Sequence, residues 1–405
     1  MQRTKRGKSH EKISRLMSAA ALEFARVGLQ AASLETIALQ ARVSRQLIYN
    51  KFGGKRGLYA AVQSAARSTL FDTLTARAST QPTPLSAVSD VLEGLFDGYM
   101  ASALLRRNFA DNGFPRGAEN PEDKWHPIYK MIEACLSRGM LSGEIKRQWS
   151  GQAFFDTAAS LIAGVTAMRT GAEEARDFTI NFIVRALKAE GNYVQKLPEL
   201  RPKTAPKADG TSAERIISAA EAQFARFGVE ASSISAIASR GGVSKQLIYY
   251  HFKNKETLHK TVQDRLLDRV LPRFEALDLE SLEPIAAVRA YVATYEQVQM
   301  AYPNSMKLDL NNRLQRGHVA VGDAAGRARS ANFLRRFEDV IIRGRADGSI
   351  HGSMTAALLF NVSAIIFCSR TASRPQAQSL PIADSSAEFD EHSIAQEFIV
   401  CGSTG

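Results

Sequence analysis

Apolar residues recur along this 405-residue chain at the spacing of amphipathic helices. Near the N-terminus, one stripe at i, i+3, i+4, i+7 and i+11 is formed by Ile13, Leu16, Met17, Ala20 and Phe24. A second stripe of the same kind is formed by Ile216, Ile217, Ala220, Phe224 and Phe227. Helical periodicity extends over nearly all of the chain, so the pattern predicts an all-α fold.

The second stripe belongs to a repeat of the first, 200 residues further along the chain. The segment that starts at Ser14 aligns without a gap with the segment that starts at Glu214, and nearly half of the aligned positions are identical. Weaker similarity continues in two further pairs of segments, Ser137–Ile145 with Ile342–Ile350 and Asp177–Val184 with Ser393–Val400. The whole chain is therefore predicted to contain two copies of one architecture.

Within each copy, the first helix is followed by two short helices. In the first copy, Gly28 is expected to end the first helix, Ser33 to cap the second and Ser44 to cap the third. The same places in the second copy are held by Gly228, Ser233 and Ser244. Two short helices joined by about four residues form the helix-turn-helix pattern, whose second helix enters the major groove of DNA.

The third helix of each copy has an inner and an outer side. Val43, Ile48 and Phe52 are expected to hold it against the other helices, so that its polar residues project outward. On that side Gln can pair with adenine, Arg with guanine and Leu with a thymine methyl group, while Lys meets phosphate. The expected DNA contacts in the first copy are Ser33, Ser44, Arg45, Gln46, Leu47, Tyr49, Asn50, Lys51 and Lys55. Those in the second copy are Ser233, Ser244, Lys245, Gln246, Leu247, Tyr249, Tyr250, His251 and Lys255.

The charge distribution agrees with this reading. The chain has 52 Lys and Arg against 41 Asp and Glu, a net charge of +11. Residues 1–57 alone contain about 12 basic and about 3 acidic residues. Such an excess suits nucleic acid or an anionic membrane, but here it gathers on a compact unit instead of a long amphipathic helix. The expected partner is double-stranded DNA, and no membrane binding is expected.

The third helix of each copy and the start of the fourth resemble a known family. Ser244–Leu258 reads SKQLIYYHFKNKETL and is similar to the signature of the tetracycline-repressor (TetR) family of one-component regulators. The first copy keeps the frame but has Asn50 and Lys51 in place of Tyr250 and His251, and GGKRG in place of KNKET. Glycine lowers helix propensity by about 1 kcal/mol per residue, so the first unit is expected to be looser or tuned to a different half-site. The resemblance covers about 50 residues in each copy.

The resemblance implies a larger helical domain after each helix-turn-helix unit, which binds an effector and supplies a dimer interface. The expected helix-turn-helix domains are residues 1–57 and 212–257, the larger domains are 58–190 and 258–405, and 191–211 is a linker rich in Pro and Lys. Phe154–Met168 and Thr355–Cys368 are almost wholly apolar and contain small residues. They are either core helices or helices that pack against each other across a pair of domains.

A small apolar or amphipathic effector is the ligand that the resemblance implies. Aromatic and polar residues ahead of the last helices are candidates for its pocket, namely Phe96, Tyr99, Trp125, His126, Tyr129, Tyr291, Tyr295, Tyr302 and Met306. Any one of them is more often a packing residue than a ligand contact. Arg370–Asp390 is an insertion in the second copy, and a loop of this length is either mobile or functional.

These features predict a sequence-specific transcriptional regulator, and a ligand-responsive repressor in preference to an activator. Because both halves are linked, the chain is expected to form an intramolecular pseudo-dimer that binds an imperfect palindrome. One alternative is a homodimer of these chains with four helix-turn-helix units. Another is an interaction scaffold in which one unit has lost DNA binding.

Other function classes find little support. The chain shows no phosphate-binding glycine loop, no paired metal ligands and no nucleophile in a recognisable frame, so neither an enzyme nor a cofactor is expected. Its three cysteines, Cys135, Cys368 and Cys401, are too scattered for a disulfide framework or a zinc site, and Cys135 is expected to be buried. No long apolar run suggests a signal peptide or a membrane span, so a cytoplasmic location is expected.

Overall fold

The computed structural model describes residues 2–78, 81–112, 126–146, 149–168, 172–190, 211–316, 324–371 and 391–404. Over these ranges the chain is helical apart from short connections, and its single β-type contact is an isolated bridge between Ile350 and Thr404. The prediction of an all-α fold is confirmed. No helix in the described ranges has both the length and the apolar character that a bilayer span requires.

The helices fall into two series with the same order. In the described part of the first half they are α1 (Gln2–Ala31), α2 (Leu34–Ala41), α3 (Arg45–Phe52), α4 (Lys55–Ala78), α5 (Pro84–Ala101), α6 (Ala103–Asn112), α7 (His126–Ser142), α8 (Gly151–Ala167) and α9 (Ala172–Lys188). In the second half they are α10 (Ser212–Ala231), α11 (Ile234–Gly241), α12 (Lys245–Phe252), α13 (Lys255–Glu275), α14 (Pro284–Ala301), α15 (Pro303–Arg316), α16 (Ala324–Asp347), α17 (Ala356–Thr371) and α18 (Glu391–Ser403). We call residues 1–190 module 1 and residues 212–405 module 2.

Each module begins with a small bundle that has its own apolar core. In module 1 the core of α1–α3 and the start of α4 contains Leu16, Phe24, Ile37 and Ile48, all with no exposed surface. The equivalent core of module 2 is built by Ile216, Phe224, Ile237 and Ile248. We call α1–α3 the first unit and α10–α12 the second unit. The helical stripes predicted from the sequence therefore face the core of each unit.

The first helix of each unit does not end where the sequence suggested. Gly28 has φ 76° and ψ 172°, and Gly228 has φ 76° and ψ 163°. The positive φ was expected, but the extended ψ makes a kink, after which the chain regains helical hydrogen bonding as far as Ala31 and Ala231. The helices thus continue beyond the two glycines, because one residue without a side chain can change the direction of a helix without ending it.

The fourth helix of each module joins the unit to the larger domain. α4 begins at Lys55 and α13 at Lys255, as expected, and both run without a break through the proposed domain boundaries near residues 57 and 257. Residues 191–210 of the expected linker and residues 372–390 of the inserted loop lie outside the described ranges. Thr211, the last linker residue, caps α10 by accepting a hydrogen bond from the backbone N–H of Glu214.

The last two helices of the modules pack against each other. α18 lies along α9 and α17 lies along α8, with α18 also contacting α8. Phe182 of α9 and Phe398 of α18 occupy the same place in the two modules, and their rings lie 6.2 Å apart. Contact between equivalent residues is typical of an interface with two-fold character. The apolar helices Phe154–Met168 and Thr355–Cys368 are thus core helices that also pack across the two modules.

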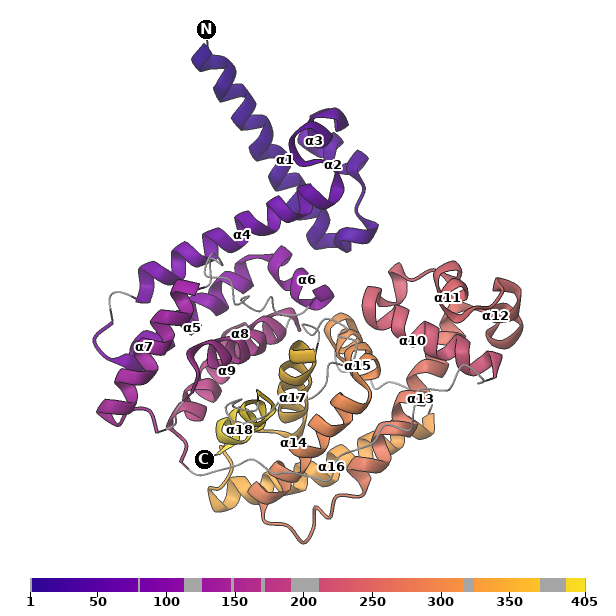
Figure 1. Cartoon of the computed structure of the whole chain (residues 1–405). Helices are drawn as coiled ribbons and strands as arrows, with labels where there is room; N and C mark the ends of the chain where they lie inside the picture. The colour runs from indigo at the N-terminus through magenta and orange to yellow at the C-terminus, as the bar shows by residue number, and fades with distance from the viewer. Residues whose placement is uncertain are drawn as a thin grey trace, which may run out of the picture.

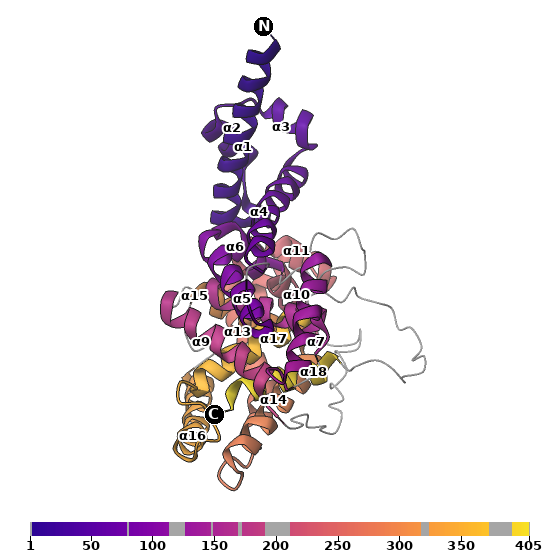
Figure 2. The same cartoon turned by 90° about the vertical axis from the view of Figure 1, so that its left-hand side faces the viewer.

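Other features of the larger domains repeat with the same register. The first backbone N–H of α8, at Gly151, donates to the carboxylate of Glu133, and that of α17, at Ala356, donates to Glu338. Buried hydrophobic residues of both modules form one continuous core. Figure 1 shows how the modules are arranged. The first unit projects from the larger domain at the N-terminal end of α4, and the second unit lies at a separate place on the periphery. The view turned by 90° in Figure 2 agrees with this separation.

Close approach of α8 and α17 leads to a first prediction. A side chain at Gly164 would meet Ile365, whose Cγ2 lies 2.5 Å from the position of a Cβ atom. Gly164→Leu should therefore overpack the junction between the modules and lower the free energy of unfolding by about 1–3 kcal/mol, measured by urea denaturation. Gly352→Ala is the matched control, because a Cβ atom there meets nothing within 4 Å. Equal stability of the two variants would contradict the close packing.

The environment of His351 predicts that the stability of the protein falls at acid pH. Burial, followed by the charge of Arg185 from module 1, lowers the pKa of His351 below its usual 6.5. The backbone N–H of Ser353 donates to Nδ1 of His351 (3.2 Å), which requires that nitrogen to be unprotonated. Below about pH 6.5 the unfolded chain binds a proton that the folded chain resists, so the free energy of unfolding should fall as the pH drops from 7 to 5.

His351→Asn isolates this contribution, because the Asn side-chain oxygen can accept the same N–H but does not titrate. Urea denaturation at pH 7 and pH 5 should show a smaller loss of stability for the variant than for the wild type. Equal losses would contradict the assignment of a lowered pKa to His351.

Candidate nucleic-acid interface

Serine residues start the second and third helices of both units, as predicted. Ser33 Oγ accepts a hydrogen bond from the backbone N–H of Thr36 (3.3 Å), and Ser44 Oγ accepts one from Leu47 (3.4 Å). Ser233 and Ser244 cap α11 and α12 in the same way, with donor–acceptor distances of 3.1 and 3.2 Å. An N-cap satisfies a backbone donor that the helix itself cannot, so these four residues set where the helices of each unit begin.

The capped third helix of the first unit presents a polar face. Ile48 is fully buried in the unit, whereas Arg45, Gln46, Tyr49 and Asn50 are exposed, as is Lys51 in the last turn. The expected inner and outer sides of the helix are therefore confirmed. Leu47 is half-buried, so only part of its side chain is available to a base.

Contacts along this face hold its side chains in place. Nε2 of Gln46 donates to Oδ1 of Asn50 (2.8 Å), which leaves Oε1 and the second N–H of the Gln46 amide for a base. Nη2 of Arg45 lies 3.4 Å from the Tyr49 hydroxyl, and the guanidinium carbon lies 5.9 Å from the centre of the Tyr49 ring. Four of the residues expected to contact DNA thus form two pairs, each one helical turn apart.

One residue of this face was missed in the sequence. Glu35, in the first turn of α2, forms an ion pair with Nη1 of Arg45 (2.5 Å), and its other carboxylate oxygen accepts from Ser33 Oγ (3.0 Å). Hydrogen bonds from its own backbone N–H and from Ser33 lower the pKa of Glu35, with a smaller effect from Arg45. The acidic residue in an otherwise basic segment was the available signal, but only the turn between α2 and α3 brings it to Arg45.

The second unit has the same frame and different side chains. Lys245, Gln246, Tyr249, Tyr250 and His251 are exposed, and the Tyr250 side chain is 81% exposed against 51% for Tyr249. Nε2 of His251 lies 2.8 Å from Oγ of Ser212, the first residue of α10, so the end of α12 is tied to the start of the unit. Leu247 is half-buried and packs against the core of the unit.

The two lysines at the start of the fourth helices have a structural contact. Nζ of Lys55 donates to the carbonyl oxygens of Gln30 (2.9 Å) and Ala32 (3.0 Å). Lys255 makes the same two contacts with Glu230 and Ser232, both at 3.3 Å. An ammonium group has three N–H donors, so a phosphate contact remains a prediction for both lysines.

The connection between α3 and α4 is rich in glycine, for reasons of space at one position and of backbone conformation at another. A Cβ atom on Gly57 would lie 1.7 Å from the carbonyl oxygen of Phe52, so the end of α3 approaches the first turn of α4 more closely than a side chain permits. Gly53 closes α3 with φ 69°, a conformation that glycine adopts without strain. The fourth helix nevertheless starts at Lys55 in both modules. The glycines here serve the geometry of the connection.

Residues expected around an effector lie mostly in the core of the larger domains. Phe96, Tyr99 and Tyr129 are buried in module 1, and burial raises the pKa of Tyr99. Of the candidates in module 2, Tyr291, Tyr295 and Met306 are buried and Tyr302 is half-buried. Trp125 and the side chain of His126 lie outside the described part of the structure.

Several of these aromatic residues have defined neighbours. The Tyr129 hydroxyl donates to Asp156 (2.9 Å), and the Tyr291 ring stacks on Phe337 with the centroids 4.7 Å apart. The Tyr302 ring lies under the guanidinium of Arg269 (5.2 Å). The structure therefore gives these residues packing and hydrogen-bonding roles, and their contact with an effector remains a prediction. The thiol of Cys135 is buried, as expected.

The units are joined to their larger domains by different contacts. In module 2, the buried carboxylate of Glu221 on α10 accepts from Ser305 of α15 and pairs with Arg269 of α13 (3.4 Å). In module 1, the position of Glu221 is occupied by Ala21, and the Tyr59 hydroxyl of α4 donates to Asn108 of α6 (2.9 Å). α1 packs on α6 and α10 packs on α15, so the position of each unit depends on helix packing, to which module 2 adds the buried charge of Glu221.

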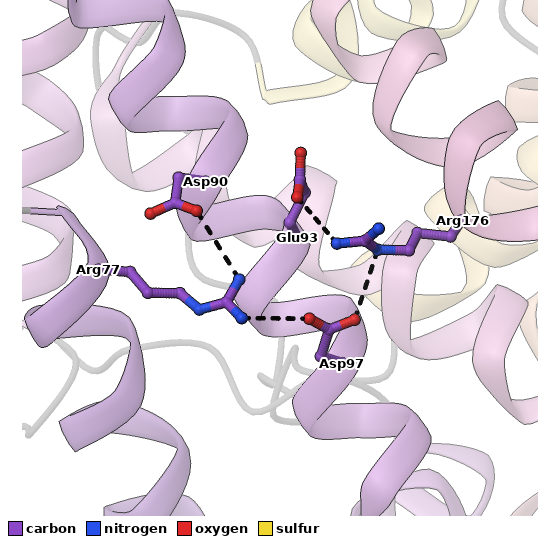
Figure 3. A network of polar contacts seen from close by, with 5 residues as sticks. All are labelled: Arg77, Asp90, Glu93, Asp97 and Arg176. Atoms are coloured by element: carbon purple, nitrogen blue, oxygen red, sulfur yellow. Dashed lines mark hydrogen bonds and ion pairs between the residues drawn. The ribbon is translucent and has the colours of Figure 1, made fainter. Parts of the chain in front are cut away.

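Module 1 has an ionic network instead at the far end of α4. Figure 3 shows Arg77 of α4 between two carboxylates of α5, and Arg176 of α9 bridging to the same helix. Nη2 of Arg77 lies 3.3 Å from Asp97, whose other oxygen lies 3.4 Å from Arg176. The network is completed by the pairs Arg77–Asp90 and Arg176–Glu93. It connects α4 through α5 to α9, the helix that packs on module 2.

Comparison with known proteins bears on these helix-turn-helix units. The family model of the bacterial regulatory proteins of the tetR family matches residues 16–62 and again residues 216–262. The HTH-type transcriptional regulator RutR of Escherichia coli K12 is 34% identical over 93 residues, which are 23% of this chain and 43% of RutR. RutR of Shigella flexneri matches with the same figures. The chain therefore aligns with less than half the length of these curated relatives.

Similar solved structures cover about half of this chain each. The ketosteroid transcriptional regulator KstR2 of Mycobacterium tuberculosis is 16% identical with a TM-score of 0.37, over 48% of this chain and 96% of KstR2. The fatty acid degradation regulator FadR of Bacillus halodurans is 14% identical with a TM-score of 0.35, over 42% of this chain and 97% of FadR. The two family matches coincide with α1–α4 and α10–α13. The chain therefore carries the helix-turn-helix domain of the tetR family of bacterial regulatory proteins twice in tandem, over residues 16–62 and 216–262.

Proposed function

We propose that this protein is a sequence-specific DNA-binding transcriptional regulator whose two helix-turn-helix units bind the two halves of one operator. The observation that carries this proposal is the exposed polar face of α3 and of α12, each on a unit that matches the family model. The net charge of +11 supports it, because basic charge supplies the sequence-independent part of DNA affinity.

Individual roles follow from the chemistry of the exposed side chains. Arg45 suits a guanine and Gln46 and Gln246 suit an adenine, because each offers two polar groups to one base edge. The phosphate contacts are assigned to side chains at the ends of the third and the start of the fourth helices, namely Lys51, Lys55, His251 and Lys255. These residues position the units, and the bases are distinguished by the exposed residues nearer the start of α3 and α12.

The two modules act as an intramolecular pseudo-dimer in this proposal. Packing of α8 and α9 against α17 and α18 supports it, since equivalent residues such as Phe182 and Phe398 meet there. Because Arg45, Asn50 and Lys51 correspond to Lys245, Tyr250 and His251, the two half-sites differ in sequence. The operator is therefore an imperfect palindrome, and tethering removes the dependence of pairing on protein concentration.

Control by an effector is the second part of the proposal. The larger domains can have one arrangement in which the spacing of the units fits the operator and one in which it does not. A ligand that binds the second arrangement more tightly lowers DNA affinity, by an amount set by the difference in its affinity for the two. α4 and α13 are the connecting helices, and the Arg77 network and the Glu221 contacts couple them to the rest of each module. The regulator is then a ligand-responsive repressor, and its effector is a small apolar or amphipathic molecule.

DNA binding is tested by removing the polar face of each unit separately. Gln46→Ala with Tyr49→Ala, and Gln246→Ala with Tyr249→Ala, should each weaken binding to a selected duplex by about 1–3 kcal/mol per lost base contact, measured by gel shift. Thr69→Ala with Thr73→Ala, on an exposed face of α4, is the control and should bind normally. If neither pair of interface changes affects binding, the assignment of the DNA-binding surface is wrong.

Light scattering of the free protein and of its DNA complex distinguishes the possible assemblies. A pseudo-dimer has the mass of one chain, 44.3 kDa, and binds one operator through both of its units. A free protein of twice this mass would favour the homodimer with four units. An interaction scaffold would show binding that depends on one unit only, so the variants of the other unit would behave as the wild type.

A further inference from the structure

The two helix-turn-helix units differ most in how their side chains are held before any DNA is bound. In the first unit the guanidinium of Arg45 is held at two points, with Nη1 at 2.5 Å from Glu35 and Nη2 at 3.4 Å from the Tyr49 hydroxyl. Glu35 is itself held, because its second carboxylate oxygen accepts from the hydroxyl of Ser33. Ser33 caps α2, so the chain of contacts runs from the helix terminus to the exposed face of α3.

Of these contacts the described part of the second unit keeps the serine cap, since Ser233 caps α11, but shows no counterpart of the two contacts of Arg45. The position of Glu35 is Ser235, that of Arg45 is Lys245 and that of Asn50 is Tyr250. Lysine is a flexible side chain with a compact charge, whereas arginine is planar and presents its donors in a fixed fork. The second unit therefore offers charge and an aromatic side chain at the places where the first unit offers an oriented guanidinium.

We propose that Glu35 is a positioning residue for base recognition, which orients Arg45 so that the first unit discriminates strongly at one guanine, while the second unit tolerates sequence variation at the equivalent position. This inference rests on the proposed function. Arginine meets O6 and N7 of guanine together through a planar fork of fixed geometry, whereas the ammonium group of lysine is a point charge on a flexible stem. A guanidinium that is already oriented loses less conformational freedom on binding. Because it cannot turn to suit another base, a wrong base costs it more binding free energy.

Glu35 has a competing effect that the experiment must separate. It is a negative charge on an exposed part of the surface assigned to DNA, so its removal reduces repulsion of phosphates at every sequence. Positioning predicts a loss of discrimination between bases. Simple repulsion predicts a uniform rise in affinity with unchanged discrimination. The ratio of affinities for two duplexes that differ in one base pair reports the first effect and is insensitive to the second.

The experiment starts from a random duplex library from which the full-length wild-type protein selects its preferred sequence. Affinities are then measured for the selected duplex and for duplexes with each half-site changed by one base pair. We expect Glu35→Gln to reduce discrimination at a guanine of one half-site by about five-fold or more, and Arg45→Lys to abolish it. Discrimination in the other half-site should change less than about two-fold, because the second unit has no counterpart of Glu35.

Two further variants make the test specific. In the Arg45→Lys background, Glu35→Gln should leave discrimination unchanged, since a positioning residue acts only through its partner. Ser235→Glu places a carboxylate at the equivalent position facing Lys245, and should lower affinity for all duplexes without sharpening base preference. Circular dichroism checks that each variant keeps its helices, and Gln at the exposed position 35 retains the helix propensity of Glu.

The outcomes separate this inference from the proposed function. If Glu35→Gln keeps the base preference of the wild type, or raises affinity for all duplexes equally, Glu35 does not position Arg45 and the inference fails. The same is true if the effect of Glu35→Gln persists in the Arg45→Lys background. If the wild type selects no sequence from the library, the proposed function fails first.

Discussion

Apolar contact between the last two helices of each module is the interaction on which the arrangement of the whole molecule depends. α8 and α9 of module 1 meet α17 and α18 of module 2, and Phe154, Phe182 and Phe398 are fully buried around the junction. Burial of apolar area is not directional, so it needs a geometric feature to set the register. Gly164 against Ile365 and Gly402 against Phe182 supply it, because each glycine admits a neighbour that a side chain would exclude.

This junction has consequences for the surfaces far from it. The helices of the junction contact α5 and α14, which pack against α4 and α13, and these two helices lead to the two helix-turn-helix units. A protein assembled from two identical chains must carry identical units. Here the two units are encoded separately, so their sequences have diverged while the frame of caps and core residues stayed the same. All four capping serines retain their contacts, whereas the exposed Arg45, Asn50 and Lys51 have different counterparts in the second unit.

Divergence extends to how each unit is held. Glu221, Ser305 and Arg269 place a buried, paired charge between the second unit and its larger domain. Module 1 relies on Tyr59 and Asn108 at this level and on the partly exposed Arg77 network further along α4. A buried ion pair responds strongly to the loss of one partner, while pairs open to solvent are weaker and screened by salt. Module 2 thus places a buried, paired charge between α10 and α13, whereas the ion pairs of Arg77 in module 1 are partly open to solvent.

Elements that depend on local chemistry could be predicted from the sequence alone. Periodic apolar stripes, serine caps and the 200-residue repeat were enough to predict the helices, the duplicated units and the outward face of α3, because helix starts and amphipathic faces are set by neighbouring residues. Gly28 shows the limit of this reasoning, since a glycine can kink a helix as well as end it. Packing of α8 against α17, the contacts of Lys55 with backbone carbonyls and the pairing of Glu35 with Arg45 were decided only by the tertiary structure. Each joins residues on different helices, and the distance between such residues depends on how the helices pack and not on their separation along the chain.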